Sequence, residues 1–177
     1  PPNRILDYIH GKEKELNQKE QELLRELPSL TAMEKAGKKK KEAYLFKGFK
    51  GIQTAIFEAL EDLTSKEEVL AMGIRSSKEE RFNLLWQRWH IERVNKKITC
   101  KAIFSDKNTE YYKIFKKMKF AEVRILEGIT PSAIDIMKDR VLIFTYGEEP
   151  SCLVIKNSEI ADSFKSFFEA LWKVAKK

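Results

Sequence analysis

The feature that most constrains the fold of this sequence is a heptad repeat of apolar residues near its start. The repeat occupies one seam of a helix and consists of Leu6, Ile9, Leu16, Leu23, Leu27 and Leu30. Glu13 and Glu20 hold the remaining seam positions, so the pattern is interrupted. A stripe this narrow needs a partner surface. We predict a helix of about 25 residues that forms a homodimeric coiled coil. The face of the following domain is the alternative partner.

A change in composition near residue 42 predicts a domain boundary. Residues 1–42 contain ten Lys/Arg, eight Asp/Glu and a single aromatic residue, Tyr8, which is too little apolar surface for a core. We expect Pro28 to kink or end the helix. The lysine run at residues 38–41 indicates a charged linker, with contact to nucleic acid as the alternative. The predicted domains are a helical dimerisation arm with a basic linker, residues 1–42, and a folded domain, residues 43–177.

Strand and helix patterns alternate through the second domain and predict its class. Apolar runs predict strands at residues 43–46, 68–74, 98–104, 120–126, 133–137, 141–146 and 152–155. Amphipathic spacing predicts helices at residues 52–63, from Ser76 or Ser77 through Val94, at 110–118 and at 158–175. This order predicts a layered α/β domain. Its mixed sheet would be parallel in the first half, antiparallel in the second, and flanked by helices.

Composition excludes several classes of protein. Aromatic residues make up 11% of the chain, more than in a disordered protein, and no apolar run is long enough to span a membrane. Cys100 and Cys152 lie in apolar runs without metal-ligand spacing. They are predicted to be buried thiols of a cytoplasmic protein. We expect no metal and no cofactor. The net charge of +7 over 177 residues is a weak footprint for nucleic-acid binding.

Two segments are candidates for binding an effector. Arg75, Ser76 and Ser77 follow the end of a parallel-type strand and precede a helix, which is where open α/β sheets gather ligands. Their guanidinium, hydroxyl and amide groups suit an anion or a polyhydroxylated ligand. The alternative is helix capping by the serines and a surface ion pair of Arg75. Gly48 and Lys50, in a strand-to-helix turn, are the second candidate, with a plain tight turn as the alternative.

No arrangement for nucleophilic catalysis is evident in the sequence. It contains two histidines, His10 and His90. His10 is expected to be exposed on the arm. His90 lies four residues from Trp86 and three from Arg93, and we expect it to be a structural or surface residue. No nucleophile has a dedicated base, so no catalytic residue is predicted.

Several stretches together resemble the TrmB family of archaeal transcriptional regulators. They are ELPSL at residues 26–30, LFKGFKGI at 45–52, DRVLI at 139–143, VIKNSEIADSF at 154–164 and FFEALW at 167–172. The resemblance implies a dimerising coiled-coil helix and a phospholipase D-like α/β domain that senses an effector, often a sugar. It also implies a winged helix-turn-helix that reads DNA. That domain is absent from this chain, so DNA would be contacted only through a domain outside it.

The phospholipase D resemblance can be tested against that family's HxKxxxxD motif. If Asp139 takes the aspartate position, the histidine and lysine positions fall on Ser132 and Ile134. Serine lacks a neighbouring base here and isoleucine carries no charge, so the sequence predicts a binding domain that is not an enzyme.

The leading hypothesis is therefore the dimerisation and effector-sensing part of a transcription regulator. Its partners would be a second copy and a small effector, a sugar or an anion, without a membrane. The alternatives are a phospholipase D-like phosphodiesterase and a stand-alone basic nucleic-acid-binding protein.

Overall fold

The computed structural model describes residues 3–37, 43–74, 79–128 and 132–176. The chain divides into two compact units, Pro1–Lys41 and Glu42–Lys177. Each unit is described by itself.

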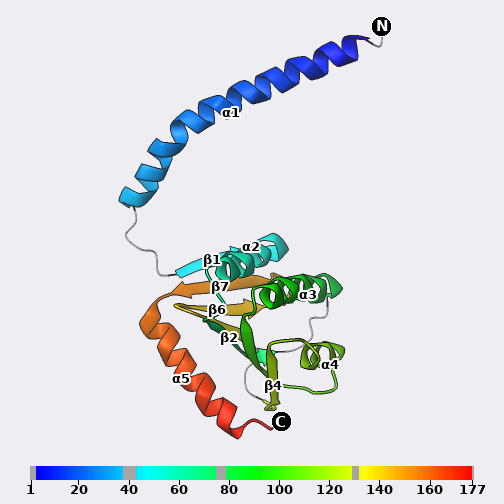
Figure 1. The fold of residues 1–177 in the computed structure, drawn as a ribbon, viewed down its shortest axis with the longest axis vertical. Coiled ribbons are helices and arrows are strands. Elements are labelled where there is room, and N and C mark those ends of the chain that lie inside the picture. The colour runs from blue at the N-terminus through cyan, green and yellow to red at the C-terminus, as the bar shows by residue number, and fades with distance from the viewer. Residues whose placement is uncertain (1–2, 38–42, 75–78, 129–131, 177) are drawn as a thin grey trace. The chain divides into compact units, whose positions relative to one another are not determined.

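The first unit is one long helix, α1, Asn3–Gly37 (Figure 1). Pro28 lies inside this helix, so the helix does not end there as one prediction had it. Proline removes one backbone hydrogen bond, and the neighbouring turns consist mostly of good helix formers. The described side chains of the heptad seam are all exposed, from 43% for Leu27 to 64% for Leu16. The side chain of Leu30 lies outside the described residues.

The second unit is built on a seven-stranded sheet with the order β1-β7-β6-β5-β2-β3-β4. The strands are β1 Ala43–Lys47, β2 Glu68–Ile74, β3 Thr99–Phe104, β4 Ala121–Ile125, β5 Ala133–Met137, β6 Arg140–Thr145 and β7 Ser151–Lys156. Strands β2, β3 and β4 are parallel, and the remaining neighbours in the sheet pair antiparallel. The predicted α/β class with a mixed sheet is therefore confirmed.

The first strand departs from the predicted arrangement. Strand β1 lies at the edge of the sheet and pairs antiparallel with β7, far from the parallel strands. This pairing sets Phe46 opposite Cys152 and places the Phe46 ring against the core beneath α2, Gly48–Glu61. The antiparallel half of the sheet therefore also contains the strand that opens the domain.

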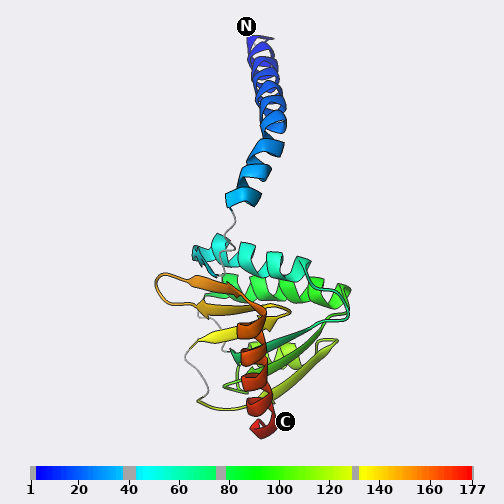
Figure 2. The ribbon, with the colours of Figure 1, turned by 90° about the vertical axis from the view of Figure 1, so that its left-hand side faces the viewer.

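Helices cover the two faces of the sheet unequally. Helices α2, α3 (Glu80–Asn95) and α4 (Glu110–Lys116) cover one face, and α5 (Ser158–Val174) covers the other (Figure 2). Alternation along each strand divides the side chains between the two faces. On β5, Ala133, Asp135 and Met137 face the three helices, whereas Ile134 and Ile136 face α5. Asp135 is therefore directed into the thicker layer of the domain.

Several local features complete the description of the fold. The side chain of Asn157 caps α5 by accepting a hydrogen bond from the Ile160 amide at 3.1 Å. Cys100 and Cys152 are buried and unpaired. The caps predicted at Ser76 and Ser77 lie outside the described residues. Within the described ranges, no helix is long and apolar enough to cross a membrane.

Candidate functional site

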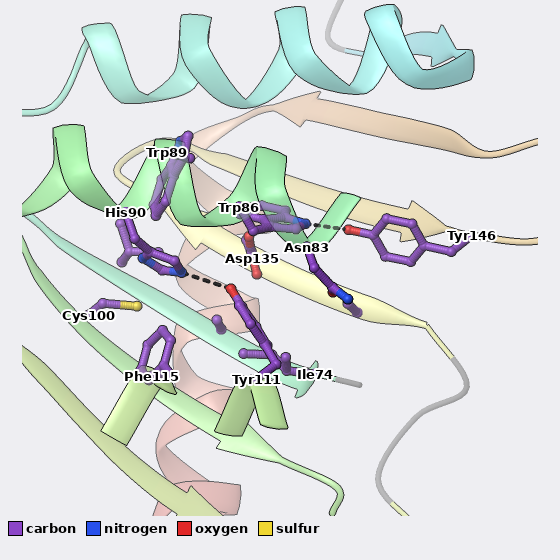
Figure 3. A pocket seen from close by; sticks show the side chains of 13 residues that line it. Ile74, Asn83, Trp86, Trp89, His90, Cys100, Tyr111, Phe115, Asp135 and Tyr146 are labelled. Atoms are coloured by element: carbon purple, nitrogen blue, oxygen red, sulfur yellow. Dashed lines mark hydrogen bonds between the residues drawn. The ribbon is translucent and has the colours of Figure 1, made fainter. Parts of the chain in front are cut away.

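A cavity of about 40 Å³ lies between the sheet and the helices α3 and α4 (Figure 3). Strands β2, β3 and β5 form its floor, and the polypeptide after β6 contributes one wall. Its aromatic and ionisable lining residues are Trp86, Trp89, His90, Cys100, Tyr111, Phe115, Asp135 and Tyr146. A cavity of this size has room for a few water molecules or for one small chemical group.

Asp135 is the acidic residue of this lining. It is 6% exposed, and burial raises the pKa of its carboxyl from 3.8 to about 7. Within the part of the chain that the structure describes, no hydrogen bond or ion pair reaches this carboxyl. A carboxyl without a polar partner in an apolar setting is uncommon, because burying a charge is costly unless it is compensated. Asp135 therefore faces the cavity without a hydrogen-bond or ion-pair partner from the described residues.

His90 belongs to a chain of hydrogen bonds that ends at the cavity. The Arg93 Nε donates to His90 Nδ1 at 3.1 Å, and His90 Nε2 lies 3.0 Å from the Tyr111 hydroxyl. Because Nδ1 accepts, the ring proton is assigned to Nε2, which donates to Tyr111. Burial, and then the charge of Arg93, lower the pKa of His90 to about 3. The ring is therefore neutral at physiological pH and positions the Tyr111 hydroxyl.

Arg93 supports this arrangement from outside the cavity lining. Its side chain is fully buried and donates to the carbonyl oxygens of Ile98 at 2.5 Å, Phe120 at 2.9 Å and Lys119 at 3.3 Å. These bonds tie the end of α3 to the residues that precede β3 and β4. With its donors used in this way, the Arg93 guanidinium holds the scaffold together and orients His90.

The tryptophans form the apolar walls. The Trp86 Nε1 donates to the Tyr146 hydroxyl at 2.8 Å, and the Trp89 Nε1 donates to the Ile56 carbonyl oxygen at 2.9 Å. The two indole rings meet edge to face with centroids 5.4 Å apart. Since both indole N–H groups are bonded elsewhere, the rings offer apolar and π surface to the cavity.

The predicted ligand residues have different outcomes. Arg75, Ser76 and Ser77 lie outside the described residues. Ile74 and Asn83, which flank that segment in the sequence, both line the cavity, so the carboxyl end of β2 reaches it.

The second predicted pair lies elsewhere in the domain. Gly48 has a φ of +71° and donates its N–H to the Pro150 carbonyl oxygen at 2.7 Å, so this amide is already hydrogen-bonded within the protein. Lys50 is exposed, and neither residue lines the cavity. An anion site at Gly48 and Lys50 stays a prediction.

Reasoning from the sequence missed Asp135 as a site residue. His90, predicted to be a structural or surface residue, is buried and accepts a hydrogen bond from Arg93 three residues on, which agrees with a structural residue. A signal for Asp135 was present. Residues 133–137 read AIDIM, and a lone carboxylate in the middle of a short apolar strand is unusual.

The positions aligned with the phospholipase D motif do not belong to the cavity. Ile134 packs among the residues under α5, on the opposite face of the sheet from Asp135. Ser132 precedes β5 and does not line the cavity either. The cavity is therefore a site separate from the one that the motif would occupy.

Comparison with known proteins supports the fold. No family model matches the chain, and no curated protein matches it in sequence. TrmBL2, an archaeal chromatin protein, is 18% identical with a TM-score of 0.57, over 98% of this chain and 68% of that chain. NucT from Helicobacter pylori is 15% identical with a TM-score of 0.57, over 76% and 97% of the two chains. Nuc from Salmonella typhimurium, a phospholipase D family member, is 12% identical with a TM-score of 0.56, over 76% and 95%.

These neighbours establish the phospholipase D-like fold and correct one prediction. At such identities the similarity shows the fold alone, so membership of the TrmB family stays a prediction. The expectation that the chain is not an enzyme is contradicted, because the fold is also that of Nuc and NucT. A missing histidine and lysine at two aligned positions are insufficient grounds to exclude catalysis from this fold.

Proposed function

We propose that this chain is the dimerisation and effector-sensing part of a transcription regulator. The observation that carries the proposal is the cavity, which holds a buried carboxyl without a partner in the described chain. The similarity to TrmBL2, whose structure is described as showing a mode of DNA binding, spans both the arm and the α/β domain and supports it. The cytoplasm is the proposed compartment, because the unpaired thiols of Cys100 and Cys152 suit a reducing environment.

Dimerisation is assigned to α1. Its described seam residues Leu6, Ile9, Leu16, Leu23 and Leu27 are exposed, and pairing with a second copy would bury them. Glu13 and Glu20 on the same seam would weaken the pair and favour one register. We expect a dimer by analytical ultracentrifugation that a Leu16→Glu variant dissociates. The matched Lys19→Glu substitution on the exposed surface should leave the dimer intact, whereas a monomeric wild-type chain would contradict this role.

Sensing is assigned to the cavity and follows a population shift. An effector held by α3, α4 and β5 would favour one arrangement of the two α/β domains, and the arm would pass that arrangement to a DNA-binding domain outside this chain. The ligand can shift the equilibrium only by its difference in affinity for the two arrangements.

The test has two stages. A ligand screen by thermal shift identifies compounds that stabilise the chain, and operator affinity of the full-length protein is then measured with and without each of them. We expect at least one stabilising compound to change operator affinity. Stabilising compounds that all leave operator affinity unchanged would contradict the proposal.

A phosphodiesterase is the second candidate, because Nuc shares the fold. His90 is the histidine that lines a cavity, and its neutral ring is hydrogen-bonded at both nitrogens. Turnover of bis(4-nitrophenyl) phosphate that a His90→Gln variant loses would support this candidate. No turnover, or equal turnover by the variant, would count against it.

A further inference from the structure

We infer that the cavity binds the ammonium group of a small organic amine, with Asp135 as its counter-ion and the rings of Trp86 and Tyr111 as its walls. This inference rests on the proposed function in one respect, namely that the cavity is a ligand site. It adds the chemical class of the ligand.

The charge of the site is the first argument. Asp135 is more than nine-tenths buried and lines the cavity with no partner among the described residues. Other buried charges of this domain are compensated by the protein itself. Arg140 bonds to Asp62 and to Asp139, and Arg93 bonds to three carbonyl oxygens. A cation that enters the cavity would give Asp135 the compensation that these arginines already have.

The walls are the second argument. A cation over the face of tryptophan or tyrosine is attracted by the ring quadrupole, most strongly where water is excluded. Trp86 and Tyr111 both line the cavity, and Figure 3 shows Asp135 lying near them. The Tyr111 oxygen accepts one hydrogen bond from His90 and has a second lone pair for an ammonium proton. The walls and the carboxylate therefore favour the same kind of ligand.

Size and the absence of cationic lining argue against other ligands in this cavity. About 40 Å³ is far below the roughly 150 Å³ that holds a benzene ring, so a sugar ring does not fit. Among the described lining residues no side chain is positively charged, because His90 is neutral and Arg93 lies outside the lining. An anion would meet the Asp135 carboxylate without a compensating cation from the described lining residues.

Binding of an amine to the cavity should depend on pH through the Asp135 carboxyl. The titratable side chains around Asp135 are His90 and Arg93 from α3, Cys100 from β3, Tyr111 from α4, Tyr146 after β6 and Cys152 from β7. Burial lowers the pKa of His90 to about 3 and raises that of Cys100 to about 12, and it also raises the pKa of both tyrosines and of Cys152. Between pH 6 and 8, the Asp135 carboxyl therefore accounts for the change in charge at the cavity.

The experiment follows the indole ¹H–¹⁵N signals of Trp86 and Trp89 during titration with n-propylammonium, 1-propanol or propionate. We expect propylammonium to bind about tenfold more weakly at pH 6 than at pH 8, because the carboxyl is mostly protonated at the lower pH. The uncharged and anionic probes should bind at least tenfold more weakly than propylammonium at pH 8. Asp135→Asn should abolish the binding, while Asp162→Asn on the exposed surface of α5 should not change it.

Several results would overturn the inference. They are equal binding of propionate, binding that does not depend on pH in the wild-type protein, and binding that survives Asp135→Asn. The comparison of propylammonium binding at pH 6 and pH 8 uses only the wild-type protein. It therefore tests the inference even if Asp135→Asn fails to fold. If propylammonium binds and operator affinity of the full-length protein does not change, the proposed function fails and this inference stands. If only uncharged or anionic compounds change both the melting temperature and the operator affinity, the proposed function stands and this inference fails.

Discussion

Neighbouring strands of the sheet each carry one buried charged residue, and the protein treats the two differently. Arg140 on β6 is paired with Asp62 and Asp139, whereas Asp135 on β5 has no partner among the described residues. Helices cover the face of the sheet on which both side chains lie. The two residues therefore differ in the polar partners that the protein places opposite them. The buried charge of Arg140 has protein partners, as expected of a structural residue, whereas Asp135 faces a cavity without a partner from the described residues, and the proposed ligand site rests on that difference.

The largest expected effect is the pH dependence of stability that the buried Asp135 carboxyl confers. The pKa of the Asp135 carboxyl is about 7 in the folded protein, against an ordinary value of 3.8 that applies to the unfolded chain. Between these pH values the folded state binds more protons than the unfolded state, so the free energy of unfolding falls as pH rises from 3.8 to 7. From this group alone the wild-type free energy of unfolding should fall by about 4 kcal/mol over that range and stay level above it. Asp135→Asn should lack this slope.

The measurement is urea denaturation of both proteins at pH 4.5, 6 and 8. Asp162→Asn, which removes an exposed carboxylate on α5, is the matched control and should keep the wild-type slope. Parallel pH profiles for wild type and Asp135→Asn would contradict a buried, unpaired carboxyl.

A second effect tests whether a compensated charge stabilises the scaffold. Arg93→Leu removes hydrogen bonds to three carbonyl oxygens and should destabilise the domain by about 3 kcal/mol. Arg88→Leu on the exposed side of the same helix should change stability by less than about 0.5 kcal/mol. Equal effects of the two substitutions in chemical denaturation would show that the buried hydrogen bonds of Arg93 contribute nothing specific.

The smallest expected effect concerns Asp→Asn substitutions at two positions. The substitution should lower the stability of the domain at Asp62 and raise it at Asp135. Asp62→Asn weakens the partner of Arg140 and should destabilise the domain by about 1 kcal/mol at pH 7.5. The value is modest because the Asp62 side chain is 51% exposed. Asp135→Asn at the same pH should stabilise the domain. Melting temperatures that shift in the same direction for both variants would remove the distinction between the two residues.

Much of the fold was predictable because hydrophobic periodicity is a local property. The apolar runs that became β2 and β3 and the amphipathic spacing of α5 are read from neighbouring residues, and they were placed within one or two residues. The position of β1 was not predictable in this way, since its partner β7 lies about a hundred residues later in the sequence. The link between His90 and Arg93 was accessible because residues three apart meet on a helix face.

The site itself required the tertiary structure. Whether Asp135 has a partner depends on side chains from α3, α4 and β3, which are distant in the sequence and meet only in the folded domain. Of the positions aligned with the phospholipase D motif, Ile134 lies on the opposite face of the sheet from Asp135. Local sequence patterns therefore predict the fold class, whereas the cavity and the position of Asp135 in it follow from tertiary packing.

The most direct test of the central claim is the titration of Asp135 itself, followed by the ¹³Cγ signal of its carboxyl with and without n-propylammonium. The free protein should show a pKa near 7, because burial disfavours the charged carboxylate. Saturating propylammonium should lower that pKa by at least one unit, since a bound cation favours the ionised form. A free-protein pKa near 4, or a pKa near 7 that the amine leaves unchanged, would contradict the account.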